Sequence, residues 1–165
     1  MNKLSLPVIA GAVVALATVA NGAPDNKGAD FLKTAIQGDN SEIMLGRMAA
    51  QNATVSPGVK QFAQMLVDDH SAHLKKVQSL AQAQGVKPPT GPMAAADVES
   101  AKLHLLKGDS FDKEFIQYMV NDHQKDIADY QQEAARHDGD VSKLAQATIP
   151  TLRKHLDAAL KLQKR

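Results

Sequence analysis

The chain has no cysteine and no tryptophan, and only two tyrosines and four phenylalanines among its 165 residues. Without cysteine it has no disulfides, no thiolate metal ligands, no cysteine nucleophile and no cysteine for N-terminal lipid attachment. An excess of charge of either sign is also lacking, because 19 Lys and Arg balance 18 Asp and Glu. This balance argues against general nucleic-acid binding, which needs a basic field. The domain must therefore be stabilised by its own core.

Only the beginning of the chain is strongly apolar. A positive start that includes Lys3 precedes residues 4–20, which are apolar or small and carry no charge. Small residues and then a polar stretch follow. This layout predicts a signal peptide over residues 1–22, cleaved after Ala20 or Gly22, and hence a periplasmic protein. The alternative is an uncleaved membrane anchor, which the run length of about 17 residues and an internal proline disfavour.

The remainder, residues 23–165, is expected to be one all-α domain. Apolar residues recur at spacings of three and four, and no segment alternates with period two. Pro150 is expected to kink the last helix, and Gly38 to mark a break or bulge in the first. Four long helices and a short connector helix between the second and third predict a four-helix bundle with a crossover. The expected helices span about 30–51, 56–85, 94–107, 109–136 and 140–162.

Four ligand-type side chains fall near the middle of the four long helices. They are Glu42, His70, His123 and His155, and each lies on the apolar stripe of its helix. At 1.5 Å per residue, each is roughly 18–21 Å from the start of its helix. A residue in the middle of a helix lies at mid-height of the bundle whether the helix runs up or down. We therefore expect the four groups to meet at one level of the bundle.

Two arrangements would satisfy these buried groups, since an unpaired buried carboxylate costs several kcal/mol. One is a bound cation, because one carboxylate and three neutral imidazoles suit zinc, iron, manganese or copper. The other is a closed hydrogen-bond network in which Glu42 accepts from the histidines, with Tyr118 or Tyr130 as further donors. The sequence favours the bound cation, because all four ligand-type groups are expected at the same level of the bundle.

Neighbouring residues form a second tier of candidate ligands. His73 lies one turn beyond His70, and Asp126 lies one turn beyond His123, so each pair offers two ligands from one helix face. Asp69 directly precedes His70 and is a candidate both as a ligand and as an acceptor that orients an imidazole. Exposed positions are expected instead for Asp68, Asp122, His104 and His137.

A combination of motifs over residues 29–162 resembles a known family. The motifs are Phe31-Leu32, Gly38, Glu42, Leu45-Gly46-Arg47-Met48-Ala49, Met65-Leu66-Val67-Asp68-Asp69-His70, Phe111-Asp112, His123 and Leu152-Arg153-Lys154-His155 after Pro150. Together they resemble the bacterial domain-of-unknown-function family 4142, whose members are often labelled outer membrane proteins and placed among ferritin-like bundles. The resemblance implies an exported ferritin-like fold and no settled activity. Ferritin-type di-iron proteins carry Glu-x-x-His pairs, which this chain lacks, so a single ion fits better than ferroxidase chemistry.

Three functions are compatible with these observations. The first is a periplasmic bundle that binds a transition-metal ion, for metal buffering or for protection against oxidative or envelope stress. The second is a metal-free structural or protein-interaction module of the cell envelope, as a homo-oligomer or with an envelope partner. The third is a hydrolase. It is disfavoured because Ser71 and Ser142 lie on helices, and because four protein ligands would leave zinc no open position.

Overall fold

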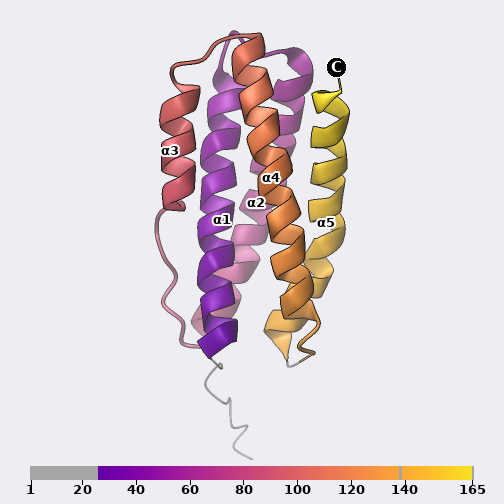
Figure 1. Cartoon of the computed structure of the whole chain (residues 1–165). Coiled ribbons are helices and arrows are strands. Elements are labelled where there is room, and N and C mark those ends of the chain that lie inside the picture. The colour runs from indigo at the N-terminus through magenta and orange to yellow at the C-terminus, as the bar shows by residue number, and fades with distance from the viewer. Residues whose placement is uncertain (1–25, 138, 165) are drawn as a thin grey trace, which may run out of the picture.

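The computed structural model describes residues 26–137 and 139–164, and this part of the chain is all-α (Figure 1). The expected four-helix bundle with one short additional helix is confirmed. The signal-peptide prediction falls on residues 1–22, which lie outside the described residues. Within the described residues, no helix combines the length and the apolar character that crossing a membrane requires. The helices are α1 (Asn26–Gln51), α2 (Pro57–Ala83), α3 (Ala94–Leu103), α4 (Asp109–Ala134) and α5 (Asp140–Gln163).

The four long helices form two antiparallel pairs. Helix α1 packs along α2, α4 packs along α5, and α2 also contacts α5. After α2 the chain returns along the outside of α1 through α3, and α4 then begins at the opposite end of the bundle (Figure 1). Helices α2 and α4 therefore run parallel, and the segment between them is the crossover expected from the sequence.

Several helix boundaries and one glycine differ from expectation, and α1 begins at Asn26 instead of at about 30. Helix α3 ends at Leu103 instead of at 107, because the chain tightens there into a turn in which Leu105 N–H donates to the Lys102 carbonyl at 3.0 Å. Gly108, at φ 55°, is the N-cap of α4, the position directly before its first residue, Asp109. Gly38 lies within a continuous α1, so the expected break is absent.

The apolar core consists of two clusters at different heights. The first includes Leu45, Leu66, Phe111, Phe115 and Met119, and the second includes Leu32, Ile36, Val77, Tyr130 and Leu152. On each long helix the ligand-type residue falls between the parts of the helix that contribute to the two clusters. The fold thus places one polar layer across the middle of an otherwise apolar interior. That layer is defined by Glu42, His70, His123 and His155, and it is called the central polar layer below.

Candidate metal centre

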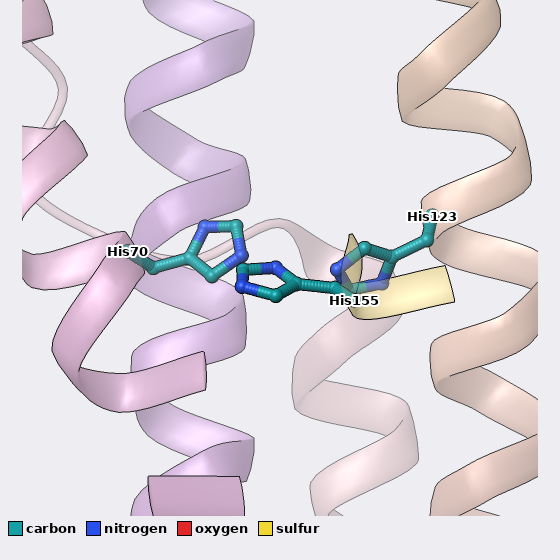
Figure 2. Close-up of side chains that lie close together, drawn as sticks. All are labelled: His70, His123 and His155. Atoms are coloured by element: carbon teal, nitrogen blue, oxygen red, sulfur yellow. The ribbon is translucent and has the colours of Figure 1, made fainter. Parts of the chain in front are cut away.

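The central polar layer brings three imidazole rings together, as the sequence predicted. Ring centroids lie 5.2 Å apart for His70 and His155, 5.2 Å for His123 and His155, and 5.9 Å for His70 and His123. Figure 2 shows the three rings converging from α2, α4 and α5. His123 and His155 are completely buried, and His70 is 5% exposed. One nitrogen from each ring lies within 4.8 Å of the other two. Small side-chain rotations suffice to reach an ion at about 2.0–2.1 Å from each nitrogen.

The other nitrogen of each ring is held by an acceptor. The Nδ1–H of His70 donates to Asp39 Oδ1 at 2.9 Å, and the Nε2–H of His155 donates to Asp69 Oδ2 at 2.8 Å. The Nδ1–H of His123 donates to the carbonyl oxygen of Met119 at 2.9 Å. Since a carbonyl or carboxylate oxygen can only accept, these contacts place the proton on the outer nitrogen of each ring. Metal-binding histidines are oriented in the same way.

The inner nitrogens are thereby left facing one another. His123 Nε2 and His155 Nδ1 are buried and make no hydrogen bond in the described structure, whereas His70 Nε2 is ion-paired with Glu42 Oε2. A buried nitrogen without a partner costs about 1–3 kcal/mol, so two at one place are unusual for a purely structural core. The closed hydrogen-bond network that the sequence left open is only partly formed, because Glu42 contacts His70 and His123 while the two unpartnered nitrogens stay outside it.

Glu42 completes the layer from α1. Its side chain is completely buried, its Oε2 forms an ion pair with His70 Nε2, and its Oε1 lies 3.3 Å from His123 Nδ1. Burial opposes ionisation of this carboxyl group, but the neighbouring His123 and His70 outweigh it and lower its pKa to about 2. The layer therefore contains a fixed negative charge at neutral pH.

The three imidazoles titrate differently from one another. Burial lowers the pKa of His155 to about 4 and also lowers that of His123. Burial acts on His70 in the same direction, but the charges of Glu42 and Asp39 outweigh it and raise its pKa well above the usual value. At neutral pH two rings are neutral and can donate lone pairs. A cation that binds here displaces the proton from the third.

The second-tier residues hold positions that differ from their predicted roles. His73 does not join the three-histidine group. Its Nδ1 donates instead to Asp39, at 2.9 Å from Oδ2. Asp69 orients His155 across the bundle and not its neighbour His70. Asp39, which is 3% exposed and accepts from both His70 and His73, was missed by the sequence analysis. Its position three residues before Glu42, on the same face of α1, was the available signal.

One expectation about exposure was wrong. Asp122 was expected on a solvated face, but it is half-buried, and with Asp126 it forms a carboxylate group around Glu42, their ligand atoms within 4.8 Å of one another. Burial and the charge of Glu42 raise the pKa of Asp122 to about 8 and that of Asp126 to about 7. The sequence could not show this proximity, because it depends on how α4 is rotated against α1. The remaining surface predictions are confirmed, since the structure exposes Asp68, His104 and His137.

The two tyrosines do not donate to Glu42 in the described structure. Tyr130 is buried, with its ring 4.9 Å from that of Phe31 and 5.9 Å from that of His73. Tyr118 is half-buried. Burial raises the pKa of both phenols above the usual value, so both hydroxyl groups keep their protons at neutral pH.

Comparison with known proteins identifies the family. The family described as "Domain of unknown function (DUF4142)" matches residues 14–162. The chain belongs to this family. No curated protein matches it significantly.

Solved structures of other helical proteins have the same fold. A DUF305 fragment from Deinococcus radiodurans has a TM-score of 0.74 and 15% identity, covering 86% of this chain and 97% of that one. CopM in a Cu(II)-bound form has a TM-score of 0.70 and 18% identity, covering 83% and 95%. CopM in a Cu(I)-bound form has a TM-score of 0.69 and 19% identity over the same shares. At these identities the likeness establishes the fold.

Proposed function

We propose that this DUF4142 protein binds a transition-metal ion in the central polar layer. The ligands are His70 Nε2, His123 Nε2, His155 Nδ1 and the Glu42 carboxylate. The observation that carries the proposal is the orientation of the rings, each held by an outer acceptor so that its inner nitrogen faces the other two rings, with His70 Nε2 also paired to Glu42. Three imidazole nitrogens that lie close together beside a buried carboxylate would form a donor set for a divalent cation, which displaces the extra proton of His70.

Copper(II) is the ion that this site should hold most tightly. Three nitrogens and one oxygen suit zinc, iron, manganese and copper, and for a fixed donor set copper(II) binds most strongly of the divalent first-row ions. Structures of CopM with Cu(II), Cu(I) and silver support the choice, because the same fold accommodates these ions in another protein. The physiological role that follows is metal buffering, or protection against oxidants, in an exported protein. Export itself rests on residues 1–22 and predicts a mature chain that begins at Asn21 or Ala23.

Calorimetric titration of the chelator-treated protein with Cu(II) tests the proposal. We expect a site that is lost in His123→Ala and unchanged in His104→Ala, which removes an exposed histidine whose ring bonds to the Ser100 carbonyl. Asp69→Asn, which disturbs the acceptor of His155, should weaken binding by about 10–100-fold. Equal affinity in the wild type and in His123→Ala would refute the site.

The alternative is a metal-free structural or interaction module. The observation that favours it is the exposure of two large apolar side chains at the crossover, Val98 at 72% and Leu105 at 84%. In that case the central polar layer fixes the packing of the bundle and binds nothing. Thermal stability that stays the same with chelator and with added copper would support this alternative over the metal site.

A further inference from the structure

Two cavities lead from the surface of the bundle toward the central polar layer. The outer one is an open groove of about 440 Å³ between the start of α1 and the end of α4. The inner one measures about 20 Å³ and lies between the same two helices, with His70 of α2 in its wall. Phe31, Thr34 and Asp129 line both cavities, so the two adjoin at these side chains. The two cavities together are called the α1–α4 passage below.

The inner end of the passage reaches a proposed ligand. His70 lines the inner cavity, and so does Asp126, one of whose oxygens lies within 4.8 Å of a Glu42 oxygen. His70 also keeps an exposed fraction of 5%, whereas the other three proposed ligands are completely buried. An ion that follows the passage therefore meets His70 first.

The inner cavity suits a cation in charge and in size. Asp39, Asp126 and Asp129 line it, and no lysine or arginine is among the described residues that do. Acidic side chains in a cleft with low-dielectric walls raise the local concentration of cations. A space of roughly 10–15 Å³ holds one water molecule, so this cavity admits an ion that has shed most of its hydration shell and excludes a bulky chelate.

The opposite face of the layer, between α2 and α5, is less suited to entry. There the ammonium group of Lys154 lies 3.1 Å from Asp69 Oδ2, and the same oxygen accepts from His155 Nε2 at 2.8 Å. A cation that approaches from this side meets a positive charge, which repels it. It also meets the ring nitrogen of His155 that already carries a proton.

We propose that a free divalent cation reaches the three histidines through the α1–α4 passage, with Phe31 as the side chain that controls its width where the two cavities meet. The inference rests on the proposed function, because it concerns the loading of the same site. The Phe31 ring lies edge-on to that of Tyr130, with centroids 4.9 Å apart, and both residues line the inner cavity. Phe31 is only partly buried, so its ring can move without opening the core.

Cobalt(II) loading of the full chain tests this route, because the visible absorbance of Co²⁺ rises when imidazoles bind it. Stopped-flow mixing of chelator-treated protein with Co²⁺ gives the association rate, and mixing of the loaded protein with excess chelator gives the dissociation rate. Thr34→Trp places a large side chain at an exposed position that lines both cavities. It should slow association and dissociation by about tenfold each and leave Kd unchanged, because entry and exit share one route. Phe31→Ala should accelerate both steps.

Gln131→Trp is the matched control, because Gln131 is exposed on α4 and lines neither cavity. This variant should leave both rates unchanged. Bound Co²⁺ with equal rates in the wild type and in Thr34→Trp overturns the passage and leaves the histidine site standing. A Thr34→Trp that raises Kd also overturns it, because an obstructed route slows both directions equally. A wild type that binds no Co²⁺ overturns both proposals.

Discussion

The metal-free central polar layer should cost the protein stability, and replacing it with apolar side chains should recover that stability. Two buried nitrogens in this layer, His123 Nε2 and His155 Nδ1, make neither a hydrogen bond nor an ion pair in the described structure. At about 1–3 kcal/mol for each atom, the gross penalty is roughly 2–6 kcal/mol. The ion pair between Glu42 and His70 offsets part of it.

The informative variant changes all four residues to leucine: Glu42→Leu, His70→Leu, His123→Leu and His155→Leu. Leucine is close in size, and the layer lies between two apolar clusters that it can join. Replacing buried ionic groups by well-packed apolar residues gains about 1–4 kcal/mol in other proteins. We expect a gain of about 3 kcal/mol over the metal-free wild type. This corresponds to a rise of about 6–12 °C in Tm for a domain of this size.

Urea unfolding followed by circular dichroism measures the difference, with both proteins in chelator. Asp39 and Asp69 keep His73 and Lys154 as partners in the variant, so no new isolated charge is created. The variant should also show no change in stability when copper is added. If it is less stable than the metal-free wild type, the layer is satisfied without an ion, and the reasoning from unpartnered atoms is refuted.

Four further predictions follow from the same structure. Cu(II) held free at about 100 times its Kd should stabilise the wild type by about 2.7 kcal/mol in urea titrations, and chelator should reverse the effect. Gly46→Ala should destabilise by about 1–2 kcal/mol, because the new Cβ would lie 3.0 Å from Val67 Cγ2 and 3.1 Å from the Ala63 carbonyl oxygen. Gly38→Ala, whose nearest neighbouring atom would be 3.9 Å away, should stabilise by about 0.5–1 kcal/mol. Burial and the neighbouring Glu114 raise the pKa of Glu99 from its ordinary value of 4.5, so ionisation of Glu99 costs stability as the pH rises above 4.5. Glu99→Gln should therefore raise Tm at pH 7 and leave it unchanged at pH 4. Three results would contradict these predictions. They are urea unfolding that copper does not change, equal stability effects of Gly46→Ala and Gly38→Ala, and a stability gain from Glu99→Gln that does not depend on pH.

The sequence predicted the level at which the site forms because height along a helix follows from residue number alone. Glu42, His70, His123 and His155 each lie at a helix midpoint, and the constant rise of the α-helix converts that position into a common layer. The helix ranges were predicted for a related reason, since glycine and proline mark most of the ends. The largest differences were the start of α1, at Asn26 instead of about 30, and the end of α3, where a turn replaced the expected last residues.

Contacts that depend on helix rotation and neighbour choice were beyond the sequence. Asp69 precedes His70 in the chain yet bonds to His155, because α2 and α5 are neighbours in the bundle. Asp39 accepts from two histidines of α2, and Asp122 turns toward Glu42 instead of solvent. Periodicity defines the face of each helix, but tertiary packing decides which faces meet.

The central claim is that the three inner nitrogens hold one ion. The most direct measurement is a crystal structure of the chain loaded with one equivalent of copper, with anomalous data collected at the copper edge. The account predicts a single strong peak about 2.0–2.2 Å from His70 Nε2, His123 Nε2 and His155 Nδ1. A central layer without a peak, or copper bound only at exposed residues such as His104 or His137, would contradict it.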